Sequence, residues 1–220
     1  MRSTRSRIAK PRVRAQQSAM ASNTTESDDT LRDFSRYLGD KHPLRIIFVG
    51  HNPSDKSWEI AAPYAHPTNK FWRLLRDAQL APPHLCKASE YKQLPRECGI
   101  GFIDLFVTSG SDASKIGRDA LKQVDWKQNF FTRLTSGTGG VDPLIICCVS
   151  KIVATKLLSG WKGEFGKVGT GRDWNLQGAE TSEVWVLPSS SGRAGLTWEA
   201  RLNPFKQLKA RTATFGAWEE

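Results

Sequence analysis

The alternation of short apolar segments with segments of helical periodicity, which begins near residue 41, most constrains the fold of this chain. Four segments are typical of largely buried strands: Arg45–Gly50, Ile100–Leu105, Leu144–Ser150 and Glu183–Leu187. Helices are predicted at Asn69–Gln79, Arg118–Leu134 and Lys151–Leu158, and a last one from Asn203-Pro204, as N-cap and first helical position, through Lys209. Because strands and helices alternate, we expect an α/β fold, a three-layer α/β/α sandwich around a mostly parallel four-stranded sheet.

The positive charge of the chain is not confined to its N-terminus. The formal net charge is +10, and residues 1–40 contain eight basic and five acidic residues, whereas residues 41–220 contain 24 and 17. This balance favours polyanionic partners, with nucleic acid before an anionic membrane surface. No stretch approaches the roughly 20 apolar residues of a membrane helix, so we expect no membrane span.

Residues 1–40 are predicted to be a disordered basic arm or targeting segment, and residues 41–220 a single domain. The first 25 residues contain six basic residues and no acid, and no apolar region of a secretory signal follows them. An Arg- and Ser-rich start suits a mitochondrial or plastid transit peptide, and equally an arm that holds DNA or directs nuclear import. Both interpretations remain open at this point.

The four cysteines form neither a metal-binding nor a disulfide pattern. Cys86, Cys98, Cys147 and Cys148 show no C-x-x-C spacing, and only four histidines could add ligands. Cys147 and Cys148 are adjacent in a predicted strand, so they should face opposite sides of the sheet. Gly166–Gly171 does not match the glycine pattern of a nucleotide-binding loop. We therefore expect reduced, mostly buried thiols in an intracellular protein without metal or cofactor.

Two polar loops follow predicted strands at their carboxyl ends, where sheets of this kind bind ligands. They are Gly50-His51-Asn52-Pro53-Ser54 and Pro188-Ser189-Ser190-Ser191-Gly192-Arg193. With two further segments they form four motifs in order: VGHNPS, PYAHPTNKFW, CGIGFIDLF and VLPSSSGRAG. In this order and spacing the motifs resemble those of the mismatch-specific uracil/thymine DNA glycosylases, a branch of the uracil-DNA glycosylase superfamily. The resemblance extends over roughly residues 44 to 210.

The resemblance implies the fold of that family and assigns roles to residues of the first two motifs. Asn52 matches the residue that binds and orients the hydrolytic water, and Tyr64 matches the aromatic residue on which the flipped base stacks. The same match places the rest of the first loop in the base pocket: Gly50, His51, Pro53 and Ser54. An amide suits this chemistry, because cleavage through an oxocarbenium-like sugar requires water to be placed more than deprotonated.

Three positions depart from the family pattern. His51 replaces an Ile and adds a group that can titrate or donate, Ser54 replaces a Gly, and Asp104 stands where the thymine branch has an Asn that contacts the base edge. An ionised Asp104 accepts from uracil N3–H but cannot donate to O4, whereas a protonated carboxyl in a buried pocket can do both. A loop role for His51 and a paired or surface role for Asp104 are the alternatives. The departures leave the preferred base open.

The serine-rich loop, Ser189–Gly192 with Arg193, matches the segment with which members of the family bind and distort DNA. Ser189, Ser190, Ser191 and Gly192 correspond to residues that bind the phosphates flanking the target through hydroxyl and backbone N–H groups. Arg193 falls at the position of the intercalating wedge, where the bacterial branch has Leu and the eukaryotic thymine branch has Arg. An arginine can fill the gap left by a flipped nucleotide and pair with the opposite guanine.

These matches imply a monofunctional DNA glycosylase that flips and hydrolytically excises uracil, or thymine, from G·U and G·T mismatches in double-stranded DNA. We expect a monomer in the nucleus that initiates base excision repair and leaves abasic sites to downstream repair enzymes. The alternatives are a glycosylase of the same superfamily for another lesion, such as hypoxanthine or xanthine, and a non-catalytic binder of mismatched or modified DNA. An RNA- or membrane-binding basic protein is a third, and it leaves the ordered motifs unexplained.

Overall fold

The computed structural model of the chain describes residues 33–34, 38, 43–110 and 125–216. All described elements lie in the unit Leu31–Glu220. Most of the arm predicted at residues 1–40, and the first part of the helix predicted at Arg118–Leu134, fall outside the described residues. The strands and helices are, in chain order, β1 (Ile46–Gly50), α1 (Asp55–Glu59), α2 (Phe71–Asp77), α3 (Leu94–Cys98), β2 (Ile100–Asp104), α5 (Trp126–Gly137), β3 (Ile145–Val149), α6 (Lys151–Leu157), β4 (Gly166–Thr170), β5 (Glu183–Leu187) and α7 (Trp198–Thr212), with 3₁₀ turns at Pro83–Leu85, Ala88–Glu90, Arg172–Trp174 and Ala213–Phe215.

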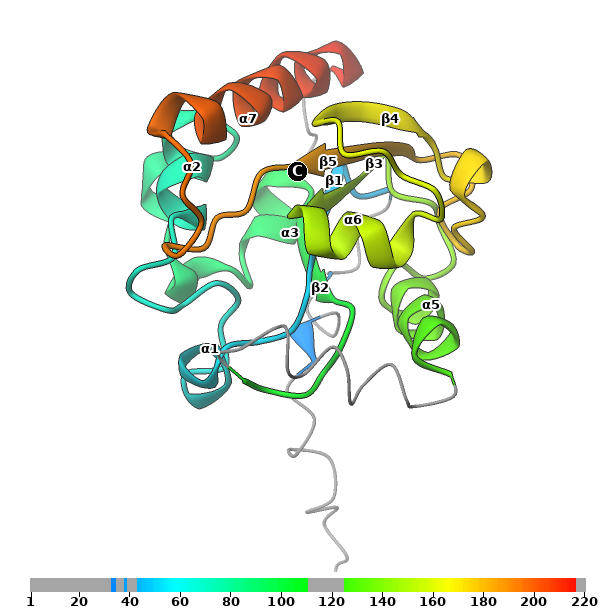
Figure 1. Cartoon of the computed structure of the whole chain (residues 1–220), viewed down its shortest axis with the longest axis horizontal. Helices are drawn as coiled ribbons and strands as arrows, with labels where there is room; N and C mark the ends of the chain where they lie inside the picture. Colours follow the sequence, from blue (N-terminus) through cyan, green and yellow to red (C-terminus); the bar gives the residue numbers. More distant parts are fainter. Residues whose placement is uncertain (1–32, 35–37, 39–42, 111–124, 217–220) are drawn as a thin grey trace, which may run out of the picture. The chain divides into compact units, whose positions relative to one another are not determined.

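A five-stranded sheet of order β2-β1-β3-β5-β4 forms the centre of this unit (Figure 1). The first four strands of that order pair in parallel, and each lies within one of the predicted strands. The expectation of four strands was wrong, because β4 adds an antiparallel edge strand beside β5. Its sequence, GKVGT, contains two glycines and one large apolar side chain, and its pairing shifts between Lys167 and Gly169. Such a segment carries no visible strand periodicity.

Helices cover both faces of the sheet, as the predicted three-layer α/β/α architecture requires (Figure 1). On one face, Phe48 of β1 packs with Phe71 of α2 and Phe205 of α7. On the other face, Val49 belongs to the core that α5 and α6 complete. Alternate residues of a strand therefore enter opposite cores. The adjacent cysteines follow this rule as predicted, with Cys147 in the first core and Cys148 in the second.

The last helix begins earlier than predicted. α7 starts at Trp198, and the hydroxyl of Thr197 caps it by accepting a hydrogen bond from the backbone N–H of Ala200 (3.2 Å). Pro204 therefore lies inside the helix, where its ring removes one backbone N–H donor. Asn203-Pro204 has the composition of a helix start, but the threonine upstream satisfies the free N–H groups of the first turn instead. No described helix, α7 included, is long and apolar enough to cross a membrane.

An ion-pair network around Glu183 ties β5 to β4 and to α7. The Glu183 side chain is only 11% exposed and accepts hydrogen bonds from Lys167 Nζ (2.8 Å), Arg211 Nε (2.9 Å) and Trp185 Nε1 (3.2 Å). Burial alone would raise the pKa of this carboxyl group, but the hydrogen bonds from Arg211, Lys167 and Trp185 outweigh burial and lower the pKa to about 2. The carboxylate is therefore charged at neutral pH and stabilises the folded chain.

Replacing Glu183 by Gln is expected to lower the free energy of unfolding at pH 7 by about 1–3 kcal/mol, because a charged acceptor is lost. The pKa of Glu183 in the folded chain lies below the ordinary value of 4.5, so its stabilisation is complete above pH 4.5 and is lost as the pH falls toward 2. Thermal unfolding of both proteins across this range measures the effect. The exposed Glu180→Gln serves as the control, and a Tm difference that stays constant down to pH 2 would contradict the assignment.

Candidate active site

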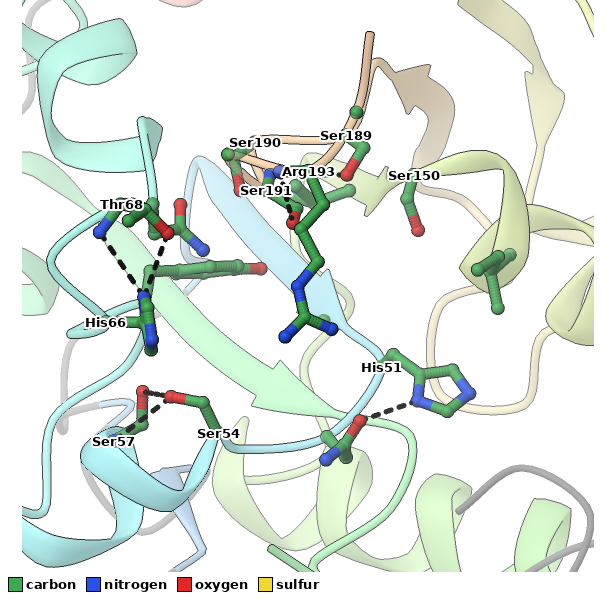
Figure 2. A pocket seen from close by; sticks show the side chains of 18 of the residues that line it. His51, Ser54, Ser57, His66, Thr68, Ser150, Ser189, Ser190, Ser191 and Arg193 are labelled. Atoms are coloured by element: carbon green, nitrogen blue, oxygen red, sulfur yellow. Dashed lines mark hydrogen bonds between the residues drawn. The ribbon is translucent and has the colours of Figure 1, made fainter. Parts of the chain in front are cut away.

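One cavity of about 650 Å³ opens at the carboxyl edge of the parallel strands, where α/β proteins bind their ligands. Figure 2 shows the side chains that surround it, which come from loops far apart in the sequence. All twelve site residues predicted from the sequence line this cavity: Gly50, His51, Asn52, Pro53, Ser54, Tyr64, Asp104, Ser189, Ser190, Ser191, Gly192 and Arg193. The loops after β1, β2 and β5 therefore meet around one space.

The amide of Asn52 is held in a single orientation. Its Nδ2 donates to the carbonyl oxygens of Pro53 and Gly110, each at 2.9 Å. Its Oδ1 lies 2.8 Å from Nδ1 of His51, the dashed line that starts at His51 in Figure 2. Both amide hydrogens are thus committed to backbone acceptors, and Oδ1 can only accept, so the His51 nitrogen must be the donor. Oδ1 keeps a second lone pair, which can accept a hydrogen bond from a molecule in the cavity.

His51 is a neutral imidazole that orients Asn52. Burial lowers the pKa of His51 below its usual value of 6.5, the hydrogen bond to Asn52 raises it in part, and the charge of Lys156 lowers it further. The ring packs edge-on against Phe106, with centroids 5.0 Å apart. Its Nε2 is buried and has no hydrogen-bond partner among the described residues. The interactions therefore favour the Nδ1–H form of a neutral ring.

Pro53 and Ser54 shape the first loop. The Pro53 carbonyl accepts from Asn52 and also from the backbone N–H of Gly110 (3.0 Å). The Ser54 hydroxyl caps α1, accepting from the backbone N–H of Ser57 at 3.1 Å, and it exchanges a second hydrogen bond with the Ser57 hydroxyl at 2.9 Å (Figure 2). Ser54 is therefore engaged in holding the loop as well as lining the cavity.

Gly50 and Asp104 face each other at the ends of β1 and β2, where they pair in register. A Cβ on Gly50 would lie 1.9 Å from Oδ1 of Asp104 and 3.2 Å from the hydroxyl of Tyr64, so only glycine leaves room for both groups. Burial raises the pKa of Asp104 to about 7, the charge of Arg133 lowers it, and the charge of Asp33 raises it. The Asp104 carboxyl can therefore take up a proton near neutral pH, unlike an exposed carboxyl group.

Tyr64 forms the aromatic wall of the cavity. Its backbone adopts the left-handed conformation (φ +53°), and its ring stacks on Phe71 with centroids 4.1 Å apart and planes 12° apart. The Tyr64 hydroxyl is buried and has no hydrogen-bond partner among the described residues. Burial raises the pKa of this phenol well above 10, and the nearby Asp104 adds to the effect. The hydroxyl therefore stays protonated and can donate to a ligand.

The serine-rich loop is folded back on itself and against the loop that carries Tyr64. The hydroxyl of Ser189 accepts from the backbone N–H of Ser191 (3.2 Å), and that of Ser191 accepts from the N–H of Arg193 (3.3 Å). Gly192 packs so closely on Thr68 that a Cβ would lie 2.7 Å from the Thr68 carbonyl oxygen. Figure 2 shows the Arg193 side chain extending from this loop over the cavity, between His66 and His51.

The sequence matches the family model of the uracil DNA glycosylase superfamily over residues 37–211. This match includes the sheet, all described helices except the end of α7, and every residue of the cavity named above. The chain belongs to this superfamily. It is therefore a DNA glycosylase, an enzyme that hydrolyses N-glycosidic bonds of DNA, with an α/β fold in which the sheet presents the site. The cavity at the carboxyl edge is the candidate active site of this glycosylase.

Two residues in or beside the candidate active site were not identified from the sequence. Arg201 of α7 is only 5% exposed, and its guanidinium binds backbone carbonyls of the serine-rich loop, including Ser189 O (2.6 Å) and Ser191 O (2.9 Å). Ser150, directly after β3, lines the cavity. Its backbone φ is +133°, a conformation that residues other than glycine rarely adopt. It caps α6 by accepting from the N–H of Val153 (3.3 Å). In the sequence, the only pattern that indicates Ser150 is a serine directly before a predicted helix. No sequence pattern indicates Arg201.

The protonation of His51 can be measured directly in the glycosylase. We expect a pKa below 6.5 and, at pH 7, a neutral ring with the hydrogen on Nδ1, because burial disfavours the charged form and Asn52 Oδ1 needs a donor. Nitrogen chemical shifts of the ring, followed by NMR from pH 8 to 5, report both quantities. A hydrogen on Nε2, or a His51 pKa at or above 6.5, would refute the proposed orientation of the Asn52 amide.

Proposed function

We propose that this glycosylase excises uracil, or thymine, from G·U and G·T mismatches in double-stranded DNA. The observation that carries the proposal is the fixed amide of Asn52, which lines the cavity. Its hydrogens are held by Pro53 and Gly110, and its Oδ1 has one lone pair beyond the bond to His51. A water molecule that donates to this oxygen turns a lone pair of its own away from Asn52. Water placed in this way can attack the C1′ atom of a nucleotide rotated into the cavity.

The reaction needs orientation more than a strong base. The C1′–N bond breaks with its electron pair on the base, and the water oxygen adds to the resulting oxocarbenium-like sugar. The proton released from the water neutralises the base anion in the net reaction, so the products are free base and an abasic site. A neutral amide suits the placing of water at such a centre. Because the nucleophile is water, the enzyme is monofunctional and leaves the DNA strand intact for downstream repair enzymes.

The cavity walls fit a planar base with a polar edge. Phe71 covers one face of the Tyr64 ring, and a base can stack on the cavity side, an interaction worth ~1–3 kcal/mol. The Asp104 carboxyl and the Tyr64 hydroxyl lie together beside Gly50. A protonated Asp104 offers a donor and an acceptor side by side, which complements the O4 and N3–H atoms of uracil or thymine. Hypoxanthine presents a similar keto and N–H edge, so it is the second candidate substrate.

The loop at Ser189–Gly192 and Arg193 supplies the contacts to DNA in this proposal. Serine hydroxyls and backbone N–H groups would bind phosphates next to the target, and Arg193 would enter the duplex in place of the flipped nucleotide. Its position over the cavity supports this role. Flipping is least costly where a base is mispaired, which gives a physical origin for a preference for G·U and G·T. The net charge of +10 favours association with DNA.

We further propose that the protein acts as a monomer in the nucleus, with residues 1–40 as a basic arm in front of the glycosylase domain at residues 41–220. The six basic residues and the absence of acids in the first 25 residues support an arm that meets DNA or an import receptor. A mitochondrial or plastid location is the alternative, since the same composition suits a transit peptide.

Replacing Asn52 by Ala is expected to reduce excision by roughly 10²-fold or more, because water is no longer placed for attack. Single-turnover excision from duplexes carrying G·U, G·T, A·U and G·hypoxanthine, with wild type and Asn52→Ala, measures the effect. Binding of both proteins to the G·U duplex is the control and should be equal, since Asn52 makes its described contacts within its own loop and to Gly110.

The duplex series also separates the alternatives. Excision of G·U by the wild type alone supports both the reaction and the role of Asn52. Excision of hypoxanthine alone would keep the reaction and change the substrate. Undiminished excision by Asn52→Ala would assign the water to another group, and binding without excision on every duplex would indicate a reader of mismatched DNA.

Excision of uracil is expected to fall as the pH rises through about 7, because ionised Asp104 can no longer donate to the base. The pKa of Asp104 is raised to about 7 by burial, so the protonated, donating form dominates below that pH. Within the described ranges, Arg133, Asp33 and the Tyr64 hydroxyl are charged or polar groups near it. Single-turnover rates on G·U between pH 5.5 and 8.5 measure the profile.

Asp104→Asn is the matched variant for this profile, because an amide keeps a donor and an acceptor at every pH. Its rate should change less across pH 7 than that of the wild type, while its Tm shows that the fold is retained. If both proteins give the same pH profile, the titrating group is not Asp104.

A further inference from the structure

The buried side chain of Arg201 holds the backbone of the serine-rich loop and of the residues that follow it, as far as Leu196. Its Nη1 donates to Ser189 O (2.6 Å) and Ser191 O (2.9 Å), its Nη2 to Ala194 O, and its Nε to Leu196 O (3.4 Å). Four carbonyl groups of one loop thus converge on one guanidinium, which is 5% exposed. A rigid fork of donors is suited to such a set of acceptors, and a lysine or an amide cannot satisfy all of them.

The carbonyl groups held by Arg201 determine where the next N–H groups point. In a trans peptide the C=O and the following N–H point in opposite directions. The N–H groups of Ser190, Gly192 and Gly195 follow three of these carbonyls, so they point away from Arg201. In the described part of the chain, none of these three N–H groups donates to an acceptor. The loop therefore presents backbone donors on the side opposite the arginine.

The charge of Arg201 is not neutralised by a carboxylate within the residues that the structure describes. Its partners there are backbone carbonyls, which carry no net charge. A buried charge is screened by salt less than an exposed one, so its field extends to the surface of the loop. The positive potential of Arg201 and the N–H groups that point away from it both favour the binding of an anion at the surface of the loop.

The loop that contains Thr68 and Lys70 also holds the serine-rich loop in place. The backbone N–H of Lys70 donates to Ser190 O (2.8 Å), and Gly192 lies against Thr68. The carbonyls of Ser189, Ser190 and Ser191 are all satisfied from within the protein. Rotation of these peptides would break internal hydrogen bonds, so the direction of the N–H groups is preset before any ligand arrives.

We propose that Arg201 is a positioning residue for DNA binding, which turns the N–H groups of the serine-rich loop toward a phosphodiester beside the target nucleotide and supplies positive potential behind them. This inference rests on the proposed binding of DNA phosphates by that loop. Arg201 makes no contact with the base or with the reacting atoms. Its loss should therefore weaken binding of the duplex much more than it slows the chemical step on bound DNA.

The test uses a full-length chain and a duplex with a tetrahydrofuran analogue of an abasic site, which has no glycosidic bond to cleave. Arg201→Gln is expected to weaken binding to this duplex by roughly tenfold and to reduce the slope of log K against log salt by about 1. Excision of uracil at saturating enzyme should stay within about threefold of the wild type, because the groups around Asn52 are unchanged.

Arg211→Gln is the matched control, since Arg211 lies on the same helix but pairs with Glu183. It should lower the Tm without changing affinity for the duplex or its salt dependence. If Arg201→Gln lowers the Tm in the same way and leaves affinity and slope unchanged, Arg201 is a structural residue and the proposal is wrong. A saturating excision rate that falls as much as the affinity would also overturn it.

Arg201→Lys decides the question if the Gln variant does not fold. Lysine keeps the charge but cannot reach all four carbonyls, so a smaller loss of affinity than for Gln, roughly threefold, is expected. Wild-type affinity and salt slope in a folded Arg201→Lys variant would overturn the proposal. Weakened abasic-duplex binding in these variants, together with no excision of any base by the wild type, would preserve this inference and refute the proposed substrate.

Discussion

The pairing of Gly50 with Asp104 at the ends of β1 and β2 determines the arrangement of the candidate active site. The register continues beyond the strands, since Leu105 N–H donates to Gly50 O (3.0 Å) and Phe106 N–H donates to His51 O (3.0 Å). These bonds fix where the loop with Asn52 leaves the sheet. The missing side chain of Gly50 gives the carboxyl of Asp104 its place, 1.9 Å from where a Cβ would be. A shift of this register by one residue would no longer place the side chain of Asp104 beside Gly50, and the pocket would lose its shape.

Several polar groups in this pocket are desolvated without being satisfied by the described chain. They include the Tyr64 hydroxyl and Nε2 of His51, and no described donor binds the Asp104 carboxyl, whose pKa is accordingly raised to about 7. Each such group costs about 1–3 kcal/mol of stability. Around Glu183, by contrast, the protein itself supplies the donors that the buried carboxylate needs. Unsatisfied groups that line a cavity can be satisfied by a ligand, so these three agree with the proposed binding of a base.

The sequence allowed prediction of the parts of the fold that depend on local pattern. Buried parallel strands need continuous apolar runs, and the four such runs are the four parallel strands of the sheet. Strand β4 is held by its neighbour and has no pattern of its own, so it was missed. The start of α7 was misplaced because Asn203-Pro204 competes in composition with the Thr197 cap. The site residues came from the resemblance of four motifs, whereas the bond from His51 to Asn52 depends on side-chain rotamers that no pattern encodes.

Two arginines on α7 differ in their partners, and this difference separates a stabilising role from the role in DNA binding that we propose for Arg201. Arg211 donates to the carboxylate of Glu183, so its charge is locally cancelled and it joins α7 to the sheet. Arg201 donates to backbone carbonyls only, among the described residues, and its charge remains beneath the loop that we propose meets phosphate. Burying an unpaired charge is unfavourable unless it is well hydrogen-bonded. The four carbonyl groups supply these hydrogen bonds. Because they point toward Arg201, the N–H groups that follow them in the chain point the other way, toward the DNA in our proposal. The same contacts that make the buried charge tolerable therefore prepare the loop for an anion.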